Sequence, residues 1–142
     1  MKRISPFHYA FPVTNLDLAR DFYVNTMQAE EARSDDRWVD FDFFGHQLSA
    51  HLVEGETKQS LPLTIVDGEH IPIPHFGLVL PKTAWVQLSD RLLKSKTKFI
   101  LEPKLRFVDT PGEQWSMFLY DPFMNGIEFK SFECDEMLFK SS

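Results

Sequence analysis

One pattern of secondary structure occurs twice in this chain, and this repeat limits the folds open to it. Each half begins with a short strand-forming segment that carries a histidine, HYAFPV from His8 and HFGLVL from His75. A segment with helical periodicity follows within a few residues in both halves. The repeat unit is too long for a solenoid, so we expect two similar modules in one domain that spans residues 1–142.

The first half, about residues 5–53, predicts a β-α-β-β-β module. Aromatic and β-branched residues form a strand over 6–13, and Asn15 is placed to cap a helix over 16–27, whose apolar residues recur at three- and four-residue steps. Three strands separated by turn-forming residues are expected to follow, at 30–34, 38–44 and 47–53.

The second half, about residues 74–133, predicts the same order. A strand over 74–80 precedes a helix over 82–94 with an apolar stripe. Three more strands are expected at 98–101, 113–120 and 126–132. Between the halves, residues 54–73 are polar and rich in turn formers, which indicates a connector long enough to cover a site.

Composition excludes several classes of function. A chain of 142 residues with 43% hydrophobic content suits one core. Its 15 Lys and Arg against 21 Asp and Glu give a net charge of −6 without any basic run, so nucleic acid is not an expected partner. No stretch approaches the roughly 18 consecutive apolar residues of a membrane span. A single cysteine, Cys134, and an N-terminus without a leader pattern lead us to expect a cytoplasmic protein.

Strand alternation indicates which polar side chains share a face. Because successive side chains of a strand point to opposite sides, Glu128 faces away from its apolar neighbours Ile127 and Phe129. In the same way, His51 lies opposite the apolar face of the strand at 47–53. A carboxylate on a strand whose other face packs in the core needs a partner, and imidazoles that share a cation with it would provide one.

His8, His75 and Glu128 together form a candidate metal site. A single histidine on a strand is ordinarily a hydrogen-bonded residue, but two histidines at matching places and one carboxylate are a ligand set associated with non-haem Fe(II). Mn, Ni, Zn or Co fit the same donors. The repeat therefore favours a divalent metal centre shared between the modules.

Several segments resemble the conserved regions of a known superfamily. PFHYAFPVTNLDLARDFY, PHFGLVL and DPFMNGIEF look like those of the vicinal oxygen chelate superfamily, which includes glyoxalase I, type I extradiol dioxygenases and bleomycin-resistance proteins. WVDFDFFGHQLSAHL, VDGEHIPIPHFGLVL, LEPKLRF and PGEQWSMFLYDP are similar to small bacterial proteins described as predicted extradiol-type dioxygenases. The resemblance covers nearly the whole chain and implies an α+β fold, with two βαβββ modules forming an open, curved mixed β-barrel with flanking helices.

The resemblance also implies a function. His8, His75 and Glu128 take the metal-ligand positions, with Fe(II) as the expected ion, and the activity is that of an extradiol-type dioxygenase acting on a small diol or catechol-like substrate. His51 is the expected acid or base. Residues expected to contact the substrate offer stacking area or polar groups: Trp38, Arg106, Gln114, Phe118 and Tyr120.

The chain departs from glyoxalase I at the fourth metal ligand. Aligning GHQLSAHL with MNGIEFKS puts Ser49 opposite Glu128, with His51 two residues further on. Two alternatives stay open: a glyoxalase-like metal-dependent isomerase, lyase or thiol transferase, and a non-catalytic binder of bleomycin-resistance type, a class that generally lacks the metal ligands. Modules of this kind pair within or between chains, so a homodimer is a further expectation.

Overall fold

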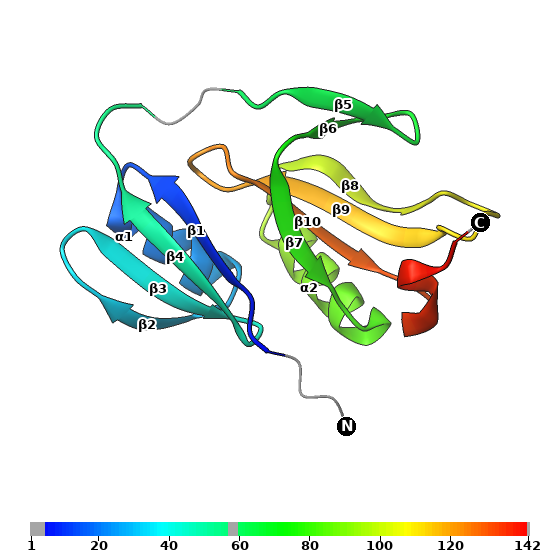
Figure 1. The fold of residues 1–142 in the computed structure, drawn as a ribbon, viewed down its shortest axis with the longest axis horizontal. Coiled ribbons are helices and arrows are strands. Elements are labelled where there is room, and N and C mark those ends of the chain that lie inside the picture. The colour runs from blue at the N-terminus through cyan, green and yellow to red at the C-terminus, as the bar shows by residue number, and fades with distance from the viewer. Residues whose placement is uncertain (1–4, 57–59, 142) are drawn as a thin grey trace. The chain divides into compact units, whose positions relative to one another are not determined.

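Two compact units make up the fold (Figure 1), which a computed structural model describes over residues 5–56 and 60–141. The first unit runs to residue 59 and includes 122–124, and the second contains 60–121 and 125–142. Each unit holds one βαβββ module with a mixed four-stranded sheet. Both sheets are open rather than closed, and the α+β fold class is confirmed.

The first unit has the predicted order of elements. Its elements are β1 (His8–Val13), α1 (Leu16–Arg20), the π-helix η1 (Asp21–Thr26), β2 (Glu30–Ser34), β3 (Trp38–Phe43) and β4 (His46–Leu52). The strand order in the sheet is β1-β4-β3-β2, with β1 and β4 parallel and the other pairs antiparallel. The expected three-stranded meander is therefore confirmed.

The helix of the first unit begins as predicted and then changes type. The Asn15 side chain accepts a hydrogen bond from the Leu18 amide at 2.9 Å, which is the expected cap. After Arg20 the helix widens to a π-helix, and the Met27 amide bonds to the Phe22 carbonyl at 2.9 Å. Over so few residues, apolar steps of three and four fit either kind of helix, so the sequence predicts the helix but not its type.

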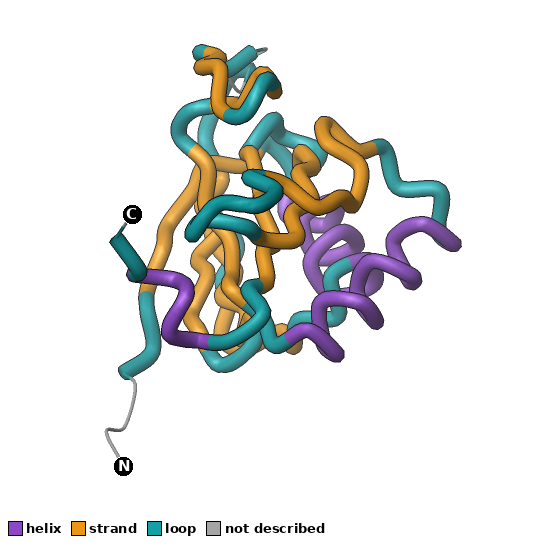
Figure 2. The backbone as a smooth tube through the Cα atoms, turned by 90° about the vertical axis from the view of Figure 1, so that its right-hand side faces the viewer, coloured by secondary structure: helices purple, strands orange, loops and turns teal. Residues whose placement is uncertain are grey.

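An aromatic cluster joins this helix to its sheet. Tyr23 is fully buried, and its ring centre lies 5.2 Å from that of Phe11 on β1 and 5.3 Å from that of Phe41 on β3. In Figure 2 the helices lie on one side of the strands of their own module. The opposite face of each sheet is left for polar side chains.

The second unit repeats the module and adds a hairpin. Its elements are β5 (Leu63–Val66), β6 (Glu69–Pro72), β7 (His75–Val79), α2 (Lys82–Lys94), β8 (Phe99–Arg106), β9 (Gln114–Tyr120), β10 (Gly126–Ser131) and the short 3₁₀ helix η2 (Asp135–Phe139). The sheet order is β7-β10-β9-β8, with β7 and β10 parallel. No helix in the described parts of the chain is long and apolar enough to cross a membrane.

Two stretches of the second unit differ from the sequence analysis. The connector contains the β5–β6 hairpin, whose two-residue turn is Asp67-Gly68 with φ of 50° and 75°. Positive φ at both positions is what a type I′ turn requires. Strand β8 continues to Arg106, beyond the expected end at Leu101, because Pro103 lies on an edge strand with irregular register, where a missing N–H is tolerated.

The register of the strands shows that the modules match residue for residue. His8 pairs with Gln47 in the first unit, and His75 pairs with Gly126 in the second. Ser49 and Glu128 each lie two residues after the partner of the first-strand histidine, so they occupy equivalent positions in the two modules, as the sequence alignment predicts.

Candidate metal and substrate site

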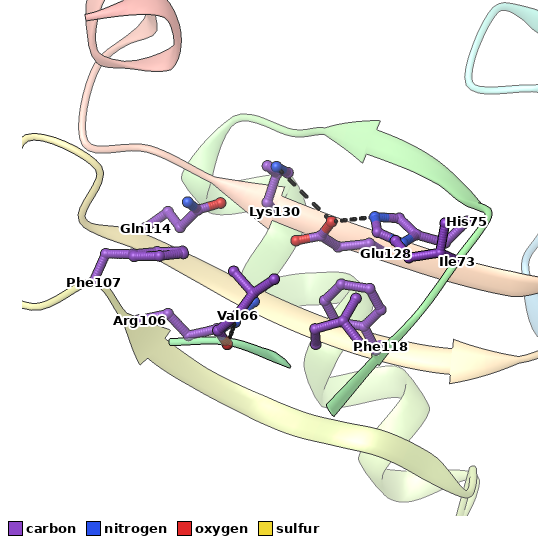
Figure 3. Close-up of a pocket in the computed structure, with 10 residues that line it drawn as sticks. Val66, Ile73, His75, Arg106, Phe107, Gln114, Phe118, Glu128 and Lys130 are labelled. Carbon is purple, nitrogen blue, oxygen red and sulfur yellow. Dashed lines mark hydrogen bonds and ion pairs between the residues drawn. The ribbon is translucent and has the colours of Figure 1, made fainter. Parts of the chain in front are cut away.

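A pocket of about 210 Å³ opens on the polar face of the second unit's sheet (Figure 3). All of its lining residues belong to this unit, and three of them come from the connector and its hairpin. The lining residues are Val66, Ile71, Ile73, His75, Arg106, Phe107, Gln114, Phe118, Glu128 and Lys130.

The centre of the pocket is the pair formed by His75 and Glu128. His75 Nε2 lies 3.1 Å from Glu128 Oε2, and Lys130 Nζ lies 3.8 Å from the same oxygen. The other carboxylate oxygen, Oε1, accepts a hydrogen bond from Ser116 Oγ at 2.8 Å. On the far side of the imidazole ring, His75 Nδ1 lies 2.8 Å from the Pro72 carbonyl oxygen. Both side chains are therefore held from two directions.

Two glycines let these side chains approach. Gly77 on β7 pairs with Glu128 on β10, and a Cβ atom at Gly77 would overlap the Glu128 carbonyl. A Cβ atom at Gly126 would lie only 3.2 Å from the Cβ of His75, so a glycine there leaves room for the imidazole. The ring of Phe118 meets the imidazole edge-on at 4.9 Å between ring centres and fixes its tilt.

The pair is electrostatically coupled. The hydrogen bond that His75 donates to Glu128 raises the pKa of His75, although burial acts in the opposite direction. Burial raises the pKa of the Glu128 carboxyl, but the hydrogen bond with His75, the charge of Lys130 and the hydroxyl of Ser116 together outweigh it, and the resulting pKa is lowered. The carboxylate is thus ionised at neutral pH, with a nitrogen facing it.

The tautomer of His75 tests whether this pair suits a metal. A carbonyl oxygen only accepts, so the Pro72 carbonyl requires a proton on Nδ1. In the neutral ring, Nε2 then carries a lone pair aimed at a carboxylate oxygen, and two acceptors in contact need a proton or a cation to join them. Adjacent ligand atoms on an octahedral ion, each about 2.1 Å from it, are about 3 Å apart, which agrees with the observed separation. The donors fit a divalent metal.

Three of the five predicted substrate contacts lie in this pocket. Arg106 and Gln114 are cross-strand neighbours on β8 and β9, and Phe118 lies next to the His75 ring. Tyr120 is on the same face of β9 by alternation but is not among the lining residues.

The structure of one known protein shows where this architecture belongs. A glyoxalase/bleomycin resistance protein/dioxygenase from Alicyclobacillus acidocaldarius has 29% sequence identity and a TM-score of 0.81, over 95% of this chain and 96% of that one. The chain belongs to the vicinal oxygen chelate superfamily. The superfamily includes many metalloenzymes and is generally metal-dependent.

More distant structures of the superfamily share the fold alone. A fosfomycin resistance protein, FosX, from Listeria monocytogenes has 17% identity and a TM-score of 0.65, over 96% of this chain and 98% of its own. A glyoxalase/dioxygenase from Nostoc punctiforme has 15% identity and a TM-score of 0.65, over 87% and 88%. No protein-family model and no curated protein matches the sequence.

The remaining predicted site residues of this vicinal oxygen chelate chain lie in the first unit. His8 is exposed at the start of β1, and His51 is exposed on β4, directly across from Trp38 on β3. Their roles stay predictions. Within the described residues, no group of three or more His, Cys, Asp or Glu side chains is gathered tightly enough to hold a metal, so the pocket provides two of the three expected ligands.

Several residues that line the pocket or contact its side chains were not predicted from the sequence. Lys130 lies on the same face of β10 as Glu128. Strand alternation could have placed it there, but nothing in the sequence assigns it a role. Ser116 contacts Glu128 because β9 and β10 pair with Ser116 opposite Lys130, and that register is not visible in a sequence. Val66 and Ile71 line the pocket because the connector forms a hairpin.

A buried carboxylate in the first unit was also missed. Asp40 on β3 pairs with Ser49 on β4, accepts a hydrogen bond from the Ser49 hydroxyl at 2.5 Å and another from Gln47 Nε2 at 3.1 Å. Ser49, which is equivalent to Glu128, is not a carboxylate itself but is hydrogen-bonded to the carboxylate of Asp40. The alternation in WVDFDF, with Val39 and Phe41 on the apolar face, would have placed Asp40 on the polar face.

Proposed function

We propose that this chain is a metal-dependent enzyme in which His75 and Glu128 from the second unit and His8 from the first hold a divalent ion. The observation that carries the proposal is the His75 ring, whose Nδ1 is committed to the Pro72 carbonyl while Nε2 faces the Glu128 carboxylate. A protonated imidazole satisfies both contacts by donating from each nitrogen, and when Nε2 loses its proton a metal ion can take the proton's place between Nε2 and the carboxylate.

We further propose an extradiol-type dioxygenation of a small diol or catechol-like substrate. Fe(II) would supply Lewis acidity and a redox-active centre for the diol and O2, and Mn, Ni, Zn or Co fit the same donors. The chain's residues orient these parts: the Pro72 carbonyl holds the His75 tautomer, and the Ser116 hydroxyl holds the Glu128 carboxylate.

The walls of the pocket suit one small ring. Phe107 and Phe118 offer apolar faces, and Ile71 and Ile73 from the connector contribute aliphatic side chains that exclude water. Ligand pockets for drug-sized molecules occupy about 300–1,000 Å³, so the volume of about 210 Å³ in this unit favours a small substrate.

Further assignments complete the proposal. His51 serves as acid or base, and Trp38 and Tyr120 contribute to substrate binding beside the residues of the pocket. The active form is a homodimer in the cytoplasm.

Elemental analysis tests the metal. Protein purified without chelator or affinity tag should contain about one equivalent of iron, and His75→Ala and Glu128→Ala should both lose it. Glu69→Gln is the matched control, because Glu69 is a carboxylate on the hairpin that pairs with Lys104 instead of His75. Oxygen uptake with a series of catechols then tests the reaction.

Other results would redirect the assignment. Nickel, zinc or manganese that is lost in the same variants, without oxygen uptake, would favour the glyoxalase-like isomerase, lyase or transferase. A chain that holds no metal and takes up none on reconstitution would contradict the enzyme and leave the non-catalytic binder.

A further inference from the structure

The end of the pocket opposite His75 is cationic. Figure 3 shows Arg106, Phe107 and Gln114 at one end and His75 at the other, with Lys130 above the space between. We propose that this end is a subsite for a carboxylate group of the substrate, with a hydroxyl on the neighbouring carbon donating to Gln114. The inference rests on the proposed function, since it assigns a substrate class to the same pocket.

Arg106 is a buried cation that has more hydrogen-bond donors than acceptors around it. Its side chain is only 3% exposed, and the structure shows one hydrogen bond from it, Nη2 to the Val66 carbonyl at 2.6 Å. Its Nε is buried without an acceptor. The nearest carboxylate, that of Asp67, is 4.0 Å away and accepts from the Phe107 amide at 3.0 Å. A buried guanidinium with five N–H groups and so few acceptors favours an anion in the pocket.

Gln114 adds an unpaired acceptor beside this cation. It pairs with Arg106 across β8 and β9 and is 8% exposed. Its Nε2 donates to the Gly112 carbonyl at 3.1 Å, which fixes the amide with Oε1 on the opposite side. Oε1 is buried and has no donor. A carboxylate cannot satisfy it, but a hydroxyl next to a carboxylate can, because the hydroxyl donates while the carboxylate accepts.

Lys130 extends the positive charge toward the metal ligands. Its Nζ lies 3.8 Å from Glu128 Oε2, and its side chain is 31% exposed at the pocket. The charge of Glu128 is shared between His75 and Lys130, so it does not balance Lys130 alone. Of the acids near Arg106, Asp67 lies 4.0 Å from its Nε and Glu69 is paired with Lys104, so the pocket has excess positive charge without any metal.

The hairpin governs entry to the subsite. Because the Val66 carbonyl accepts a hydrogen bond from Arg106 Nη2, and the Arg106 Nε and Gln114 Oε1 atoms are shielded from solvent, the incoming carboxylate replaces the Val66 carbonyl on the guanidinium. The turn at Asp67 shifts outward as this happens, because its backbone is continuous with Val66.

Titration calorimetry on the metal-free full-length chain tests the subsite. Salicylate, which has a carboxylate beside a hydroxyl, is expected to bind at least about tenfold more tightly than neutral salicylamide, as a charge-assisted hydrogen bond predicts. Arg106→Gln should abolish this preference. Lys130→Gln, at a partly exposed position where the substitution does not endanger folding, should lower the affinity for salicylate by about threefold or more. Gln114→Leu should remove the preference for salicylate over benzoate.

Lys104→Gln is the matched control. Lys104 lies on β8 two residues before Arg106 and pairs with Glu69 outside the pocket, so its loss should leave salicylate binding unchanged. Equal binding of salicylate and salicylamide, no binding of either, or equal losses in Lys104→Gln and Lys130→Gln would each overturn the subsite. The measurement uses no metal and no turnover, so its failure leaves the metal analysis standing. A chain that binds salicylate but never takes up metal would overturn the enzyme and keep the subsite.

Discussion

His75 Nδ1 lies 2.8 Å from the carbonyl oxygen of Pro72, the last residue of the β5–β6 hairpin. This contact connects the connector to the proposed metal centre, because it decides which ring nitrogen of a neutral His75 faces Glu128. In that proposal the segment between the modules would have a part in the chemistry as well as in the pocket wall.

The metal-free protein should show a stability maximum that depends on this pair. The raised pKa of His75 means that its contribution is complete below the ordinary imidazole value, about 6.5, and is lost as pH rises through the raised value. The lowered pKa of Glu128 means that its contribution is present above about 4.3 and is lost as pH falls through the lowered value. The difference in unfolding free energy between wild type and Glu128→Gln, measured with urea, should therefore be largest, about 1 kcal/mol, near pH 5.5. A difference that stays the same on both sides of this maximum would contradict the coupling.

Ser116→Ala should weaken the metal site. The substitution removes the hydroxyl that donates to Glu128 Oε1 at 2.8 Å, and the loss of such a supporting hydrogen bond typically lowers metal affinity about tenfold or more. Competition with a chromogenic chelator measures the affinity. Ser131→Ala is the control, since the Ser131 hydroxyl on β10 is also buried but has no hydrogen-bond partner. An equal effect of the two substitutions would show that the hydroxyl of Ser116 does not orient the carboxylate.

Gly77→Ala should destabilise the second unit. The added Cβ atom would overlap the backbone carbonyl of Glu128, so β7 must move away from β10 at a cost of about 2 kcal/mol or more. Gly112→Ala is the comparison, because a Cβ atom there makes only ordinary contacts, the nearest at 3.7 Å from the Thr110 hydroxyl. Chemical denaturation of the two variants measures the difference, and a Gly77→Ala protein as stable as Gly112→Ala would mean that the two strands are not so closely apposed.

Asp67 should control how often the hairpin opens. It adopts a positive φ of 50° in the turn and accepts a hydrogen bond from the Phe107 amide at 3.0 Å. Asp67→Ala loses both the turn preference and the acceptor and should ease local opening by about 1 kcal/mol, whereas Asp67→Asn keeps both. Hydrogen exchange at the β5–β6 amides, compared with exchange in β9, measures this. Equal exchange in the two variants would argue against the turn as the hinge.

Much of the fold could be predicted because the strongest patterns are local. The helix Lys82–Lys94 and the strand Glu30–Ser34 have the bounds that periodicity and turn residues indicate. The Asp67-Gly68 pair is an equally local signal for a hairpin, but Pro62, Pro72 and Pro74 around it favour a connector over strands. The end of β8 could not be predicted, because the tolerance of Pro103 depends on the strand lying at a sheet edge.

The site was predictable to the extent that it follows from alternation along single strands. His75 and Glu128 come together as expected, and Arg106, Gln114 and Phe118 join them in the pocket. Ser116 and the hairpin's share of the wall depend on which strands pair and in what register, which is a property of the folded chain.

The hairpin belongs to neither copy of the module. The residues that shape the pocket wall therefore lie partly in a different stretch of sequence from the strands that hold His75 and Glu128. His75 and Glu128 are fixed by strands whose glycines and packing leave little freedom, while Val66, Ile71 and Ile73 lie in a joining segment outside both repeats. Randomising residues 63–71, which spares Pro72 and its contact with His75, should therefore yield proteins that keep the proposed metal ligands yet accept differently shaped molecules. For protein engineering, the segment between the duplicated halves is therefore the part of the pocket that can be varied.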